Sequence, residues 1–267
     1  MTQEEKARRF RDLHHGPAIL VLPNAWDVGT AKVFEAVGFP AIATTSAGVA
    51  AALGYPDGER ISRDEMLEMV ARIARAVAVP VTADMEAGYG DPVATAKAVV
   101  GAGAIGMNLE DRAGADSPTL VDLEVQCALL REIRALALPL VVNARTDVYL
   151  ANIGDPSTRL ERAIERANAY CEAGADSLFV PGVYDRETIG ALAREVRGPL
   201  NILATPGAPS IAELHALGVV RVSTGSGPAR ASLALVRRIG VELREGSCAS
   251  MFDSQIPYAE VYRMLEG

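Results

Sequence analysis

Short apolar segments alternate with longer amphipathic segments along almost the whole chain. The apolar segments are short and contain few polar residues, which is typical of parallel strands that are buried on both faces. We expect eight such strands, at residues 18–22, 41–45, the run that starts after Pro80, 104–109, 138–144, 177–180, 200–204 and 219–223.

Helical segments follow these strands, at residues 29–37, 62–78, 92–102, 119–137, 156–173, 186–196, 210–216 and from about Pro228 onward. Four of the helix ends carry a glycine just before the next strand: Gly38, Gly103, Gly174 and Gly218. We interpret these glycines as helix-terminating residues with positive φ. Eight strand–helix alternations in about 250 residues predict a (β/α)8 barrel, with a doubly wound open sheet as the alternative.

The two ends of the chain lie outside this repeat. Residues 1–15 are charged and predict a helix rather than a signal peptide. Residues from about 241 to 267 predict further helices. We therefore expect a single α/β domain over 1–267, a TIM barrel with extra N-terminal and C-terminal helices.

Composition narrows the class of protein. The formal net charge of −8 and the pI of about 5.0 argue against a broad nucleic-acid surface. No apolar run approaches the roughly 18 residues of a membrane span. The three cysteines show no paired spacing, which favours a reduced, cytoplasmic protein. An anionic ligand would need a local cation, because the overall charge is negative.

One stretch places two carboxylates at the end of a buried strand. Asp84 and Glu86 follow the apolar run after Pro80, and Gly88 and Gly90 then allow a tight turn. Asp91 and the proline after it predict the start of the next helix. Two like charges at a buried position are costly without a positive partner, and a divalent cation is the simplest one.

Other strand ends supply more polar residues, and barrel active sites lie at the carboxyl ends of strands. The candidates are Asn24, Trp26, Asp27, Ser46, Ala47, Gly48, Asp57, Glu110, Asp111, Asn143, Arg145, Asp147, Asn201 and Thr205. Carboxylates without His or Cys suit Mg²⁺, with Mn²⁺ as the alternative. Arg145 suits bidentate binding of a carboxylate or phosphate. Each residue also has a structural interpretation, as an ion-pair, capping or packing residue, and Asp111 favours pairing with a basic neighbour.

Five segments, taken in order, resemble the isocitrate lyase/phosphoenolpyruvate mutase superfamily over nearly the whole chain. They are Asn24-Ala25-Trp26-Asp27, Thr45 to Gly58, Asp84 to Gly90, Leu109-Glu110-Asp111 and Ala144-Arg145-Thr146-Asp147. The resemblance implies a barrel that binds Mg²⁺ and a small 2-oxo or 2-hydroxy carboxylic acid. It also implies homo-oligomers, dimers or tetramers, in which C-terminal helices are exchanged between subunits.

The resemblance further implies roles for individual residues. Asp84 would bind the metal, while Asp57, Glu86 and Glu110 would hold its waters. The substrate would contact Trp26, Ser46, Ala47, Gly48, Asp84, Arg145 and Asn201. Arg145, Asp57 and Glu110 would form the catalytic set.

The chain departs from the family pattern at three places. Lyases of the family carry a Lys-Lys/Arg-Cys-Gly-His lid after the fourth strand, whereas residues 112–118 here contain neither Cys nor His. Pro181 stands where tricarboxylate lyases place a glutamate, and Glu86 stands where aspartate is usual. The usual lyase acid/base is therefore missing.

We accordingly predict a Mg²⁺-dependent carbon–carbon lyase or decarboxylase that acts on a small, oxaloacetate-like di-acid through a metal-stabilised enolate. One alternative is a non-catalytic 2-oxo acid binding protein that keeps the metal cradle. Another is a methylisocitrate-lyase-like enzyme with a replaced acid/base, for instance Tyr55, Asp116 or Ser117.

Overall fold

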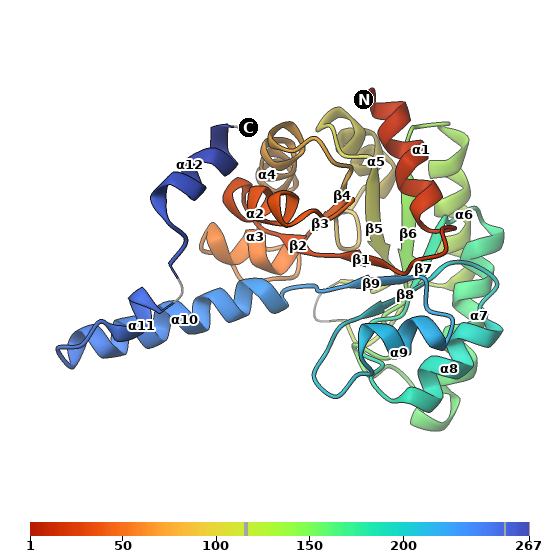
Figure 1. Cartoon of the computed structure of the whole chain (residues 1–267). Helices are drawn as coiled ribbons and strands as arrows, with labels where there is room; N and C mark the ends of the chain where they lie inside the picture. Colours follow the sequence, from red (N-terminus) through yellow and green to blue (C-terminus); the bar gives the residue numbers. More distant parts are fainter. Residues whose placement is uncertain (115–116, 254, 267) are drawn as a thin grey trace.

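The computed structural model describes residues 1–114, 117–253 and 255–266, and in them one parallel sheet closes into a barrel (Figure 1). Its strands are β1 Leu20–Leu22, β2 Asn24–Ala25, β3 Ile42–Thr44, β4 Val81–Asp84, β5 Gly106–Glu110, β6 Val141–Arg145, β7 Ser177–Phe179, β8 Leu200–Leu203 and β9 Arg221–Ser223. β1 pairs with β9 and β2 pairs with β3, so these two short strands act as one barrel strand interrupted at Pro23. The predicted (β/α)8 barrel is confirmed, and closure by the β1–β9 pair excludes the doubly wound sheet.

Helices surround the barrel. They are α1 Gln3–Leu13, α2 Val28–Val37, α3 Ser46–Ala52, α4 Arg63–Ala76, α5 Pro92–Gly101, α6 Leu123–Ala135, α7 Arg159–Glu172, α8 Arg186–Glu195, α9 Ile211–Ala216, α10 Gly227–Arg244, α11 Ala249–Phe252 and α12 Tyr258–Glu266. The expected terminating glycines Gly38, Gly103, Gly174 and Gly218 all have φ between 91° and 100°. The helix predicted from residue 119 begins only at Leu123, because Asp122 caps it by accepting from the amides of Glu124 and Val125.

Helix α1 closes the amino-terminal end of the barrel. Phe10 of α1 is completely buried, in a cluster with Leu20, Leu22, Ile105 and other apolar residues of the strands. The side chain of Thr2 caps the helix through a reciprocal pair of hydrogen bonds with Glu5. The opposite, carboxyl-terminal end of the barrel is therefore the end that remains available for a ligand.

The C-terminal helices leave the barrel. Figure 1 shows α10 as a long arm that extends beyond the strands, with α11 folded back along it and α12 returning toward α2. These helices expose the large apolar side chains of Leu233, Val236, Val241, Leu243, Phe252, Tyr258, Tyr262 and Leu265, and Ile256, between α11 and α12, is exposed as well. In the described residues, none of the helices is both long and apolar enough for a membrane crossing.

Candidate active site

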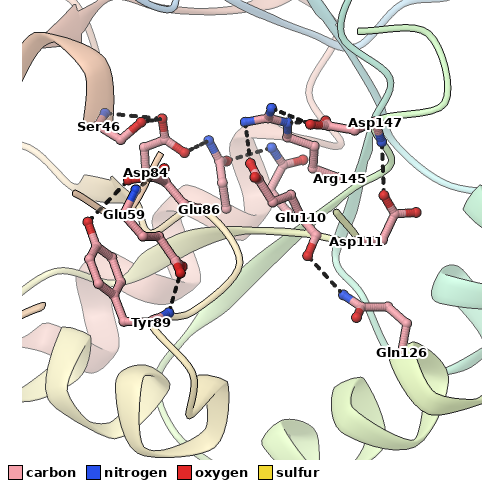
Figure 2. Close-up of polar contacts among 12 residues, drawn as sticks. Ser46, Glu59, Asp84, Glu86, Tyr89, Glu110, Asp111, Gln126, Arg145 and Asp147 are labelled. Atoms are coloured by element: carbon pink, nitrogen blue, oxygen red, sulfur yellow. Dashed lines mark hydrogen bonds and ion pairs between the residues drawn. The ribbon is translucent and has the colours of Figure 1, made fainter. Parts of the chain in front are cut away.

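Three neighbouring strands end in charged residues that the parallel register brings together. Asp84 is the last residue of β4, Glu110 of β5 and Arg145 of β6. Glu110 pairs directly with Arg145 in the ladder, and Asp84 pairs with Asn108. The charged ends therefore lie side by side at the open end of the barrel, as Figure 2 shows.

Two adjoining cavities open above these strand ends. The larger, of about 360 Å³, is lined by Asn24, Thr45, Ser46, Ala47, Asp57, Asp84, Asn108, Arg145, Leu150, Phe179, Pro181, Leu203, Thr205, Ser223, Gly225, Ser226 and Arg230. The smaller, of about 250 Å³, is lined by Ser46, Asp57, Gly58, Glu86, Glu110, Arg112, Arg145, Asp147 and Leu150. Ser46, Asp57 and Arg145 line both, so the two cavities share one polar wall.

Hydrogen bonds fix the carboxylate of Asp84 from both sides. The backbone amide and the hydroxyl of Ser46 donate to Oδ2, at 3.2 and 3.0 Å. The side-chain amide of Asn108 donates to Oδ1 at 3.2 Å. Asn143 Nδ2 in turn donates to Asn108 Oδ1 at 2.8 Å, which sets the orientation of the Asn108 amide. Ser46 and Asn108 therefore hold Asp84 in one orientation through neutral donors.

Arg145 is held between two carboxylates. Its Nη1 lies 2.6 Å from Glu110 Oε2, while Nε and Nη2 donate to Asp147 Oδ1 and Oδ2 at 2.6 and 2.8 Å. Burial raises the pKa of Glu110, and the positive charge of Arg145 opposes that shift. A guanidinium has five N–H groups, so two remain for a ligand in the cavity.

Glu86 lies at the edge of the smaller cavity in an unusual backbone conformation, with φ of +50°. Its Oε2 accepts from the backbone amide of Glu59 at 2.9 Å, and its Oε1 accepts from the Tyr89 hydroxyl at 3.2 Å. Burial, followed by the charges of Asp57 and Asp84, raises its pKa from 4.5 to about 8. Desolvation and Asp84 also raise the pKa of Asp57.

Three of the residues predicted to bind substrate lie elsewhere. Trp26 and Gly48 line a separate groove of about 220 Å³ between α3 and α10. A Cβ on Gly48 would lie 2.6 Å from the Thr45 methyl and 2.9 Å from the Trp26 Cβ, so this glycine serves close packing. Asn201 is completely buried and exchanges hydrogen bonds with Ser223, so it lies one layer beneath the larger cavity. The structure thus gives these three residues packing and supporting positions.

The structure also shows the surroundings of Asp111 and of two of the three residues considered as replacement acids or bases. Asp111 pairs with Arg166, whose Nε lies 2.7 Å from Oδ2, so its predicted pairing with a basic residue is correct. Tyr55 is exposed, with its hydroxyl 3.5 Å from Glu65, and Ser117 bonds to Thr119. Asp116 lies outside the described residues.

Sequence reasoning counted Asn143 among the strand-end candidates but assigned no role to three other residues that shape the site: Asn108, Glu59 and Tyr89. Asn108 could have been found, because it is two residues before the charged strand end Glu110 and so faces the same side of the sheet. Glu59 and Tyr89 gave no such signal, since their contacts join two separate loops.

The residues fit a divalent cation of the Mg²⁺ type. No three His, Cys, Asp or Glu side chains of the described chain stand close enough together to ligate one ion jointly. The carboxylates of Asp57, Asp84, Glu86 and Glu110 nevertheless gather around the two cavities, and burial, together with neighbouring carboxylates, raises the pKa values of Asp57, Glu86 and Glu110. Mg²⁺ keeps several waters, so one direct carboxylate and several water-mediated ones suit it.

The chain is similar to known proteins over most of its length. The sequence pattern of the family described as phosphoenolpyruvate phosphomutase matches residues 10–244. The chain belongs to the phosphoenolpyruvate mutase/isocitrate lyase superfamily. A crystal structure from Burkholderia cenocepacia J2315, given only the general description lyase/mutase, is 36% identical with a TM-score of 0.91 and covers 99% of this chain and 97% of its own.

Relatives in this superfamily differ in what is known of them. An uncharacterised protein of Mycobacterium tuberculosis is 38% identical over 96% of this chain and 95% of its own. A 2-methylisocitrate lyase of Halalkalibacterium halodurans is 33% identical over 74% of this chain and 67% of its own. An oxaloacetate decarboxylase of Rhodopseudomonas palustris is 30% identical over 92% and 88%. The structure of a phosphonopyruvate hydrolase with oxalate and Mg²⁺ is 25% identical, with a TM-score of 0.84 over 99% and 95%.

The pKa of Glu86 predicts a pH-dependent stability of the metal-free protein. Between pH 4.5 and about 8, the unfolded chain ionises Glu86 while the folded chain keeps the proton. The unfolded state then binds fewer protons, so the free energy of unfolding falls as the pH rises through this window. We expect Glu86→Gln to reduce this fall, as measured by chemical denaturation from pH 5 to 9 in the presence of a chelator. If the stability of Glu86→Gln depends on pH as that of the unmodified protein does, the raised pKa of Glu86 is not the cause of the fall.

Proposed function

We propose that this protein is a Mg²⁺-dependent carbon–carbon lyase or decarboxylase that acts on a small 2-oxo or 2-hydroxy di-acid. The observation that carries the proposal is the cavity that Asp84, Asp57 and Arg145 share, with Glu86 and Glu110 beside it. It combines an acidic cradle suited to a hard cation with a guanidinium suited to an oxygen anion. Arg230 adds a second positive charge to the lining of the larger cavity.

The relatives support this class of reaction. A 2-methylisocitrate lyase and an oxaloacetate decarboxylase both match most of the chain, and both names describe cleavage of a carbon–carbon bond in a small carboxylic acid. The phosphonopyruvate hydrolase structure holds oxalate together with Mg²⁺ on the same fold. Oxalate carries the paired oxygens that a 2-oxo acid would present to a cation.

The residues of this chain would divide the work as follows. Asp84 would hold Mg²⁺ directly, while Asp57, Glu86 and Glu110 would hold its waters. When bound, Mg²⁺ supplies Lewis-acid polarisation of the 2-oxo group. Arg145 would direct its two remaining N–H groups to the oxygen on which negative charge develops during cleavage. Its ion pairs with Glu110 and Asp147 hold the guanidinium in place before substrate arrives.

A second candidate is a non-catalytic binder of 2-oxo acids. The observation that favours it is the segment 112–118, which lacks the Cys and His of the lyase lid. Incubation with Mg²⁺ and oxaloacetate separates the two candidates. The enzyme should release pyruvate well above the rate given by Mg²⁺ alone, whereas a binder should bind 2-oxo acids tightly in calorimetry without turning over any of them.

We further propose that the protein forms dimers or tetramers through α10, α11 and α12. Their exposed apolar side chains would be buried by exchange of these helices between subunits, since many large apolar side chains exposed on neighbouring helices are unusual on a monomer. Truncation after Gly246 removes α11 and α12 and should lower the oligomeric state in sedimentation velocity. If the truncated protein keeps the same number of subunits per particle as the full chain, the proposed exchange of helices is wrong.

A further inference from the structure

Two loops at the barrel mouth are joined by a ring of three hydrogen bonds. The backbone amide of Glu59 donates to Glu86 Oε2 at 2.9 Å, and the Tyr89 hydroxyl donates to Glu86 Oε1 at 3.2 Å. The backbone amide of Tyr89 donates to Glu59 Oε1 at 2.7 Å, which closes the ring (Figure 2). We call these three residues the clasp. It links loop 53–62, between α3 and α4, to the turn after β4.

The backbone of the clasp is strained. Glu59, Glu86 and Tyr89 have φ of 56°, 50° and 56°. Only two other non-glycine residues of the described chain, Ala137 and Asn152, have positive φ. This region is unfavourable for residues that carry a Cβ, and it persists where surrounding contacts over-determine it. Three such residues that hydrogen-bond to one another indicate that the ring holds both loops in this shape.

The clasp lies next to a residue of the site. Asp57 precedes Glu59 by two positions and lines both cavities, and it is exposed, as are Leu53 and Tyr55 of the same loop. Gly54 and Gly58, with φ of 86° and 93°, give the loop conformational freedom on either side of Asp57. The lining of both cavities, as far as the chain is described, excludes Glu59 and Tyr89, so these two residues act through other groups.

We propose that Glu59 and Tyr89 are positioning residues, which act through Glu86 to fix loop 53–62 and keep Asp57 in the site. The cation that Asp57 would serve belongs to the proposed function above, but the attachment of the loop does not depend on it. Glu86 thus has a structural task in addition to any contact with metal-bound water. Removal of the clasp should release the loop and move Asp57 without changing the lining residues themselves.

A matched pair of variants tests this inference. Glu59→Ala removes the acceptor for the Tyr89 amide, while Glu59→Gln keeps an oxygen acceptor at nearly the same place and removes only the charge. Tyr89→Phe removes the donor to Glu86. Glu68→Ala, which breaks an exposed ion pair on α4, serves as the control. The two readouts are hydrogen exchange of the backbone amides of Tyr55 and residues 57–60, and Mn²⁺ affinity measured by calorimetry without substrate.

We expect Glu59→Ala and Tyr89→Phe to speed exchange in this loop by about threefold to tenfold, the effect of one net hydrogen bond. Mn²⁺ affinity should fall by a similar factor, and Glu59→Gln and Glu68→Ala should stay within about twofold of the unmodified protein. Exchange in Glu59→Ala as slow as in the unmodified protein would overturn the proposal, as would an equal loss in Glu59→Gln. If the unmodified protein binds no Mn²⁺, the metal cradle fails while the exchange result still decides on the clasp.

Discussion

Replacement of Asp84 by alanine should abolish both Mg²⁺ binding and turnover. Asp84 is the carboxylate that Ser46 and Asn108 hold in a fixed orientation, and it lines the larger cavity. Loss of groups that merely orient a metal ligand already costs roughly 10- to 100-fold in affinity, so loss of the ligand itself should cost more. Calorimetric titration with Mg²⁺ and a steady-state assay with oxaloacetate measure the two losses.

A control separates this loss from a folding defect. Asp84→Asn keeps the size of the side chain and an oxygen that can accept from Ser46, so its thermal unfolding should stay close to that of the unmodified protein. It should still bind Mg²⁺ far more weakly, because the charge is gone. If either variant retains Mg²⁺-dependent activity, Asp84 is not the residue that binds Mg²⁺.

Replacement of Arg145 by methionine should lower both the stability and the activity of the protein. It leaves Glu110 and Asp147 without their cation, and both carboxylates are almost completely buried. Removal of one partner from a buried ion pair costs about 3–5 kcal/mol of unfolding free energy. For a chain of this size, that corresponds to a fall of roughly 10 °C in the melting temperature. Activity should fall as well, because the proposed reaction uses two N–H groups of Arg145 to bind the substrate.

A double variant tells the two effects of Arg145 apart. Asp147→Asn in the Arg145→Met background removes one unpaired charge and should recover part of the lost melting temperature. It should recover none of the activity if Arg145 contacts the substrate. Recovery of activity together with stability would mean that Arg145 serves only to hold the fold.

The barrel could be predicted from local signals alone. Apolar runs, capping residues and the glycines at positions 38, 103, 174 and 218 all reflect short-range chemistry, and the structure confirms them. The observed helix boundaries differ from the predicted ones where a capping residue sets the end of the helix, as Asp122 does at the start of α6. The hydrophobic pattern also did not predict the break of the first strand at Pro23. Proline cannot donate to a strand ladder, and it therefore divides β1 from β2.

The site could be predicted only in part, for a geometric reason. Strand order and register place Asp84, Glu110 and Arg145 together, and both follow from the barrel. The direction of a side chain just beyond a strand end does not, which is why Trp26 was expected to contact substrate yet lies in the groove beside α10. Contacts between distant loops, such as that of Glu59 with Tyr89, depend on backbone shapes that sequence periodicity does not encode.

The initial rate of pyruvate release from oxaloacetate with saturating Mg²⁺ tests the proposed reaction when it is compared with the rate in EDTA and with the rate of Asp84→Ala. The metal-only rate is subtracted throughout, and other 2-oxo and 2-hydroxy di-acids are assayed in parallel. We predict enzyme-dependent turnover of oxaloacetate or another of these acids, abolished both by EDTA and by the substitution. Binding of these acids without turnover of any of them, or turnover that survives EDTA, would contradict a Mg²⁺-dependent carbon–carbon lyase.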